Sequence, residues 1–198
     1  MMKKYIAESI GTFALAFAVF LGVVAGAGSP LAVPVIAGLA LGLCVYSIGA
    51  ISGCHINPAV TLGALSIKKI SLKDAIGYIV FQFFGAAIAL AVGTLVFNFH
   101  VTGATSAFTL IPFVAETIGT FLFTFGIASV MYGKVAPAAS GLVIGGSLTL
   151  GALIAGIAGS AGILNPAVAL ALNSFSWVYI LAPILGSILG MQVYKALS

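Results

Sequence analysis

"SGCHINPAV" occupies residues 52–60 and "GILNPAVAL" occupies residues 162–170, so the letters Asn-Pro-Ala-Val occur twice, in otherwise apolar tracts. Asparagine is among the best residues for capping a helix N-terminus, because its side-chain oxygen accepts a backbone N–H. Proline is favoured at the first helical position, where its missing N–H has no cost. The two Asn-Pro pairs are therefore predicted to begin two helices rather than to interrupt longer ones.

The composition indicates the class of protein. Of the 198 residues, 62% are hydrophobic and 5% are charged, whereas soluble domains carry about 25% charged residues. Such a chain cannot cover a globular surface with polar groups, so we expect an all-α integral membrane protein. Helices are favoured over a barrel because the apolar runs are long and continuous, without the alternation of barrel strands. We expect a single domain over residues 1–198.

Hydropathy predicts six transmembrane helices and two shorter helices that follow the Asn-Pro pairs. A helix needs about 20 residues to cross the hydrocarbon core of a bilayer. The predicted spans are 5–26, 33–51, 75–97, 112–132, 138–157 and 176–196. The short segments, 57–66 and 165–173, are each about 14 Å long at ~1.5 Å per residue. They can enter a membrane from one side, but they cannot cross it.

The chain contains an internal repeat, in which "AESIGTF" at 7–13 matches "AETIGTF" at 115–121. Three pairs of residues share an offset of 108 positions: Glu8 and Glu116, Gly38 and Gly146, Asn57 and Asn165. We expect two repeats, residues 1 to about 105 and about 109 to 198. A cleaved signal peptide is the alternative for the first span. The counterpart of that span lies in mid-chain, so we expect the first span to be retained.

Charge predicts the orientation of the spans. The chain has no arginine and seven lysines. With the N-terminus in the cytoplasm, every lysine falls on the cytoplasmic side, as the positive-inside rule requires. We therefore expect a multi-pass protein of the cell membrane with both termini in the cytoplasm. Three spans per repeat make the two repeats inverted, so the short helices enter from opposite sides and meet near the midplane.

This arrangement predicts a pore with a polar centre. Irregular backbone at the depth of the midplane is tolerated only inside protein or beside a water-filled cavity. The glycine-containing loops before the short helices, "ISGCHI" and "GSAGIL", suit exposed carbonyl groups. Two asparagine amides supply hydrogen-bond donors at the centre. Two positive helix-dipole ends converge there and repel cations.

The sequence "SGCHINPAVTLG" resembles the first signature of the aquaporin, or major intrinsic protein, family. "AESIGTF" and "AETIGTF" are similar to the start of its first and fourth helices. The resemblance implies an aquaporin-like fold with a pore in each subunit of a homotetramer in the lipid bilayer. It also implies passive movement of water or small uncharged solutes, with protons excluded. The residues that match the two family motifs are Asn57, Pro58 and Ala59, and Asn165, Pro166 and Ala167.

One position departs from the family pattern. Most members place an arginine directly after the second Asn-Pro-Ala, in the outer selectivity filter, but this chain has Val168. The resemblance places the other filter positions at Ala37, Leu153 and Gly162. This ring is small, aliphatic and uncharged, so we predict an unusually wide filter with weak discrimination by size. Candidate solutes besides water are glycerol, urea-like solutes, neutral metalloid hydroxides and small organic arsenic compounds.

Three ionisable residues within or near the spans need an interpretation. Glu8 and Glu116 are expected to accept hydrogen bonds from the loops before the short helices; an interfacial position and a proton relay are the alternatives. His55 precedes the first Asn by two residues and is expected to line the inner pore mouth. Its role there is to shape the loop, with gating by protonation as the alternative. Gln82 is expected to form a hydrogen bond between helices.

The remaining motifs leave two classes of function. No catalytic triad, phosphate loop, nucleic-acid motif, cofactor motif or metal-ligand cluster is present, so we do not expect an enzyme. A passive channel is the primary interpretation. A secondary transporter is the alternative, because transporters also use inverted repeats and broken helices. Coupled transport usually needs an ionisable group near the midplane, and we predict only the two asparagines there.

Overall fold

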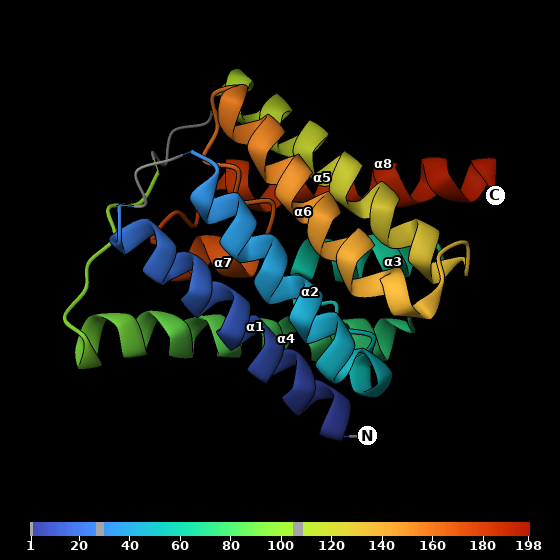
Figure 1. Cartoon of the computed structure of the whole chain (residues 1–198), viewed down its shortest axis with the longest axis horizontal. Coiled ribbons are helices and arrows are strands. Elements are labelled where there is room, and N and C mark those ends of the chain that lie inside the picture. Colours follow the sequence, from blue (N-terminus) through green and yellow to red (C-terminus); the bar gives the residue numbers. More distant parts are fainter. Residues whose placement is uncertain (1, 27–29, 105–108) are drawn as a thin grey trace.

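The computed structural model describes residues 2–26, 30–104 and 109–198, and within these ranges it contains helices and no β-strand. Figure 1 shows the course of the chain. The elements are α1 (Met2–Val24), α2 (Ala32–Ser52), α3 (Pro58–Ser66), α4 (Leu72–Ala91), the π-helical turn η1 (Val92–Val96), α5 (Leu110–Met131), the 3-10 turn η2 (Pro137–Ala139), α6 (Ser140–Ile157), α7 (Pro166–Ala171) and α8 (Trp177–Leu197).

Six helices in the described ranges are long and apolar enough to cross a membrane, as predicted. They have 21 to 25 residues, counting α4 with η1 and η2 with α6. Helix α7 is shorter than the predicted segment 165–173, because the chain turns at Asn173, whose φ is 52°. The N–H of Ser174 closes this turn on the carbonyl of Ala169 at 2.8 Å.

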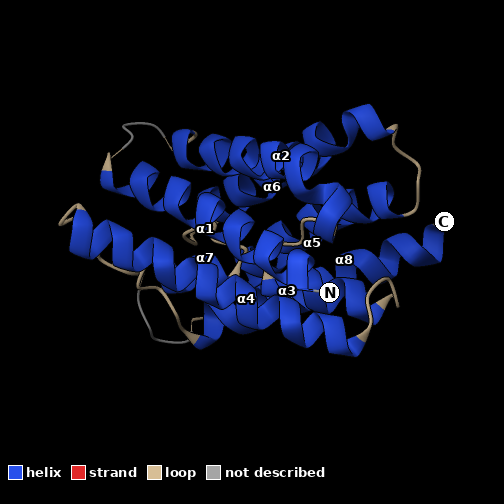
Figure 2. Ribbon diagram, turned by 90° about the horizontal axis from the view of Figure 1, so that it is seen from below, coloured by secondary structure: helices blue, strands red, loops and turns tan. Residues whose placement is uncertain are grey.

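The two short helices lie in the middle of the bundle. Figure 2 shows α2 and α6 along one side of the bundle, with α3 and α7 farther in. Helix α3 packs against α8, and α7 packs against α4, so each short helix contacts a long helix of the other half of the chain. Their N-termini point toward each other from opposite directions, which is the inverted arrangement of the aquaporin-like fold.

Glycine allows the long helices to approach closely. A Cβ atom at Gly38 in α2 would lie 2.5 Å from the carbonyl oxygen of Gly145 in α6. The predicted symmetry mate, Gly146, does not take part, because it is exposed and a Cβ atom there would meet nothing within 4 Å. The offset between the repeats identifies α2 and α6 as the helices that cross. Which residue of α6 faces α2 depends on local packing. In α8, Gly190 similarly packs against the Phe121 carbonyl of α5.

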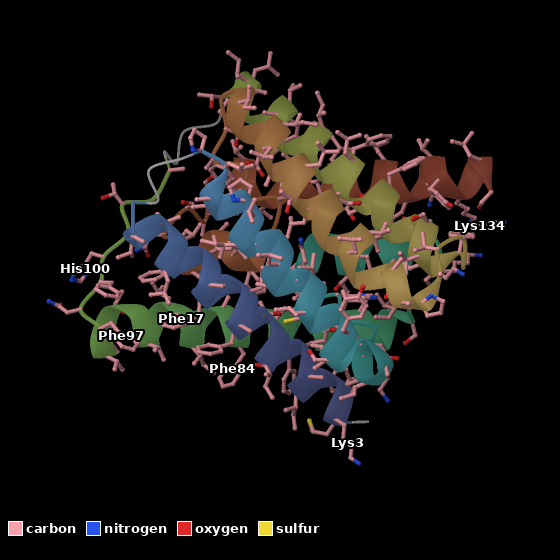
Figure 3. All side chains as sticks on the ribbon, viewed as in Figure 1. Lys3, Phe17, Phe84, Phe97, His100 and Lys134 are labelled. Carbon is pink, nitrogen blue, oxygen red and sulfur yellow. The ribbon has the colours of Figure 1, made fainter. Side chains whose placement is uncertain are left out.

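Charged residues are concentrated at one end of the bundle. Lys3 and Lys134 lie at the end opposite to Phe97 and His100 (Figure 3). At the same end Lys4 forms an ion pair with Asp74, with 2.8 Å between Nζ and Oδ2. A bundle of apolar helices with its cations gathered at one end is the charge pattern of a membrane protein with a defined orientation.

The close helix crossing makes a prediction about stability. We expect Gly38→Ala to lower the free energy of unfolding by about 2 kcal/mol or more, because its Cβ would collide with the backbone of α6. Gly146→Ala is the matched control, since it adds the same methyl group to open space. Thermal unfolding of both variants in detergent checks the prediction. Equal melting temperatures for the two variants would contradict the packing described.

Candidate functional site

Each asparagine of the repeated motif caps the short helix that follows it. Asn57 has extended backbone angles, φ −159° and ψ 120°, and its Oδ1 accepts a hydrogen bond from the N–H of Ala59 at 2.8 Å. Asn165 is equivalent, and its Oδ1 accepts from the N–H of Ala167 at 2.9 Å. The prolines at the first helical position give up no backbone hydrogen bond. The caps therefore start both helices at the positions that the sequence predicts.

The two caps are joined by reciprocal hydrogen bonds. The Nδ2 of Asn57 donates to the carbonyl of Leu164 at 2.9 Å, and the Nδ2 of Asn165 donates to the carbonyl of Ile56 at 3.1 Å. Each acceptor is the carbonyl just before the opposite asparagine. Both asparagines are 2% exposed. Each Nδ2 has two hydrogens, so one hydrogen of each amide stays available for another acceptor.

The loops before the caps have unusual backbone geometry. Cys54, Ile56 and Leu164 have φ angles of 53°, 38° and 53°, in the left-handed region that side chains other than glycine rarely adopt. Such residues cost roughly 1–3 kcal/mol each and persist only where surrounding contacts hold them. The loops therefore need strong anchoring, which two buried glutamates supply.

Glu8 anchors the first loop. Its carboxyl oxygens accept hydrogen bonds from the N–H groups of His55 at 3.0 Å and Ile56 at 2.6 Å. They also accept from Ser52 Oγ and from Gln82 Nε2, both at 2.7 Å. The side chain is 0% exposed, so the alternative of an interfacial position does not fit. With its N–H groups bound to Glu8, the loop is free to present carbonyl groups elsewhere.

Glu116 anchors the second loop in the same way. It accepts from Ser160 Oγ at 2.5 Å, from the N–H of Ile163 at 3.0 Å and from the N–H of Leu164 at 2.7 Å. It too is 0% exposed. The contacts of Glu8 with Ser52, His55 and Ile56 thus recur at the repeat offset.

A cavity of about 370 Å³ extends from the end of the bundle away from the lysines to the two asparagines. All four residues proposed from the sequence as a filter line this cavity: Ala37, Leu153, Gly162 and Val168. Asn57, Asn165 and His55 line its inner part. Among the described residues that line it, none is Lys, Asp or Glu. We call this space the outer cavity.

Two backbone contacts shape the wall of the outer cavity. Gly162 has a φ of 65°, and a Cβ atom there would lie 2.5 Å from the carbonyl oxygen of Ala152, so the second loop presses directly on α6. The connection after α4 lies over the chain that follows α7, because Asn173 Nδ2 donates to the Val101 carbonyl at 3.2 Å. Ser174 Oγ accepts from the N–H of Ala104 at 2.9 Å. The sequence did not indicate that residues 101–104 contribute to this wall.

A second cavity, of about 430 Å³, lies at the lysine-bearing end of the bundle. We call it the inner cavity; its lining includes Ser52, His55, Lys69, Asp74 and Tyr78. His55 lines both cavities, so it lies at their junction.

His55 is held by side chains whose connection the sequence did not reveal. Its Nδ1 lies 3.2 Å from Thr61 Oγ1, and its ring packs edge-on against Tyr78 at a centroid distance of 5.2 Å. Gln82 connects Thr61 to Glu8. The signal available in the sequence is a difference between the repeats, because Ala169 stands at the position equivalent to Thr61.

Two half-helices meeting tip to tip inside six membrane-crossing helices, with a cavity on either side of the junction, define a membrane channel of the aquaporin-like class. The sequence profile of the family "Major intrinsic protein" matches residues 1–194 of this chain. The chain therefore belongs to the major intrinsic protein family, whose members are passive channels for water and small solutes.

Individual relatives show how broad the similarity is. The chain is 32% identical to Aquaporin AqpM of Methanothermobacter thermautotrophicus, over 99% of this chain and 97% of the relative. It is 38% identical to Glycerol uptake facilitator protein-like 6 of Lactiplantibacillus plantarum, over 95% of this chain and 94% of the relative. The solved structure of the aquaglyceroporin from Plasmodium falciparum superposes with a TM-score of 0.73 and 25% identity, covering 98% and 95% of the chains.

The glutamate anchors make a second prediction. In Glu116→Gln the amide nitrogen replaces one of the two carboxyl oxygens, so it faces the N–H of either Ile163 or Leu164, a donor against a donor, and leaves a buried polar group unpaired. We expect the free energy of unfolding to fall by about 2 kcal/mol or more. Asp74→Asn, which removes a charge from a partly exposed ion pair, is the control and changes it by about 1 kcal/mol or less. Circular dichroism during heating in detergent compares the two, and equal losses would disprove the anchoring role.

Proposed function

We propose that the outer and inner cavities are the two halves of one passage that joins at Asn57, Asn165 and His55. The observation that carries this proposal is that the outer cavity reaches both asparagine amides and that His55 lines both cavities. One hydrogen of each amide is not used in holding the half-helices together. A solute oxygen at the centre would accept from these two donors as it passes.

Cation exclusion in this proposal rests on the centre of the passage. The N-termini of α3 and α7 converge there and bring two positive dipole ends together. Amide donors at the same place orient an oxygen lone pair toward the protein and favour uncharged molecules over cations. The outer filter adds no fixed charge, because Val168 occupies the position where most family members have arginine.

The proposed filter consists of Ala37, Leu153, Gly162 and Val168. Arginine would contribute a positive charge and several donors, and it would narrow the ring. Valine contributes none of these, and alanine and glycine leave room for a solute. We therefore propose a channel for uncharged solutes larger than water, such as glycerol, urea or neutral metalloid hydroxides, with water passing as well. A relative named as an aquaporin and one named as a glycerol uptake facilitator are both compatible with this range.

The setting of the channel follows from charge and symmetry. We place the lysine-bearing end, and with it both termini, on the cytoplasmic side of the cell membrane. The outer cavity then opens on the extracellular side. Residues 1 to about 105 and about 109 to 198 are the two repeats, as the recurring contacts of Glu8 and Glu116 support. A homotetramer is the assembly that the family resemblance implies, with a complete passage in each subunit.

Solute flux into proteoliposomes tests the proposed function. We expect purified protein to accelerate osmotic swelling in glycerol, urea and arsenous acid, with no ion gradient and without saturation at millimolar solute. Empty vesicles give the background rate. Flux that depends on a sodium or proton gradient would identify a secondary transporter instead. Acceleration for water alone would disprove the wide filter.

Two variants at one position test the filter. We expect Val168→Arg to reduce glycerol flux roughly tenfold or more while reducing water flux much less, because it narrows the ring and adds charge. Val168→Leu is the matched control, since it adds volume without charge or donors, and it should reduce glycerol flux to a smaller extent. Stopped-flow light scattering measures both fluxes. Equal reductions in water and glycerol flux by Val168→Arg would show that this residue does not lie in the filter.

A further inference from the structure

The two halves of the chain differ in the polar side chains behind their loops. The first half has Thr61, Gln82 and His55. The equivalent residues of the second half are Ala169, Pro183 and Ile163; the offset is 108 in the loop and the short helix, and 101 between α4 and α8, where Gly186 packs on α5 as Gly85 packs on α1. The second loop nevertheless has the same anchors to its glutamate as the first. A loop of this shape therefore does not need the three polar side chains, and their presence in the first half calls for another explanation.

The donors and acceptors of these side chains can be assigned one by one, beginning at Glu8. A Glu8 oxygen accepts from Gln82 at 2.7 Å, and this contact fixes Nε2 of Gln82 as the atom that faces Glu8. The second hydrogen of that Nε2 goes to Thr61 Oγ1 at 3.0 Å. Thr61 is therefore an acceptor toward Gln82.

The hydroxyl hydrogen of Thr61 is also committed. It is donated to the carbonyl of Asn57 at 3.0 Å, which is shorter than the alternative contact of 3.4 Å with Gln82 Oε1. In either case the hydrogen does not point at His55. The contact of 3.2 Å between Thr61 Oγ1 and His55 Nδ1 is then a hydrogen bond only if Nδ1 carries the hydrogen.

We propose that Glu8, Gln82 and Thr61 hold His55 with its hydrogen on Nδ1, so that the bare Nε2 accepts hydrogen bonds from solutes at the junction of the two cavities. Nε2 has no hydrogen-bond partner among the described side chains and loops. The imidazole is 7% exposed, and it lines both cavities. The edge-on contact with Tyr78 limits rotation of the ring. Thr61 and Gln82 are positioning residues in this arrangement.

This inference rests on the proposed passage, and it specifies the chemistry of the solutes. Asn57 and Asn165 offer donors, whereas His55 offers an acceptor. A solute with hydroxyl or N–H groups can accept from the asparagines and donate to His55 at neighbouring positions. A solute that only accepts loses the second contact. The passage therefore favours polyols, amides and neutral hydroxides over acceptor-only solutes of similar size.

The position of the hydrogen is measured directly by nitrogen NMR. The chain has two histidines, His55 and His100, so ¹⁵N-histidine labelling with a His100→Asn variant assigns the His55 signals. In lipid vesicles we expect protonated Nδ1 and unprotonated Nε2. We expect Thr61→Val to move the hydrogen to Nε2 in a substantial fraction of molecules, and Thr61→Ser to retain it on Nδ1. Protonated Nε2 in the unmodified chain would overturn the proposal even if no variant folds.

Paired solute fluxes test the consequence for transport. We expect Thr61→Val to lower the ratio of ethylene glycol to dimethyl sulfoxide permeability about threefold to tenfold, the effect of one hydrogen bond. Thr61→Ser should restore the ratio. Thr12→Val is the matched control, since Thr12 is a buried threonine whose hydroxyl donates to the backbone carbonyl of Glu8 in its own helix, and not to His55, Thr61 or Gln82. An unchanged ratio in Thr61→Val would overturn the role in selectivity. If the unmodified protein passes neither solute, the proposed passage fails, and the NMR result still decides the hydrogen position.

Discussion

Two hydrogen bonds between the tips of the short helices determine much of the rest of the structure. Each asparagine uses its oxygen to cap its own helix and its nitrogen to hold the opposite loop. The irregular backbone at this junction lies inside the bundle, where unpaired polar groups are costly. The buried glutamates bind the loop N–H groups, and the six long helices enclose the result. The apolar helices of the fold thus enclose and support one small polar junction, at which the two asparagines meet.

The two halves share this support, but they differ in what they present to a solute. The glutamate anchors recur with nearly the same distances, so the loop shape is a property of the repeat. The surroundings differ, because the outer half is lined by aliphatic residues such as Leu153 and Val168, whereas the inner half contains His55. A symmetric scaffold thus carries an asymmetric passage. Selectivity in such a channel can lie at the junction rather than at the outer ring.

The sequence predicted the helices, their inversion and both capping asparagines, because capping and hydropathy are local properties. It did not predict that each amide binds the carbonyl before the opposite asparagine. Every residue has a backbone carbonyl, so the residue type does not indicate which carbonyl accepts a hydrogen bond. The repeat offset paired Gly38 with Gly146, whereas the close helix crossing is between Gly38 and Gly145, because an offset between repeats does not determine which residues pack together. The link from Gln82 to Thr61 depends on proximity in space, and only the difference between Thr61 and Ala169 hinted at it.

An experimental density map of the protein in lipid, at a resolution that shows ordered water, tests the central claim most directly. The account predicts each asparagine Nδ2 within hydrogen-bond distance of the carbonyl before the opposite asparagine. It also predicts a continuous file of water from the outer cavity past both amides and His55 to the inner cavity. Amides that are separated from each other's loops, or a dry, closed wall between the two cavities, would contradict it.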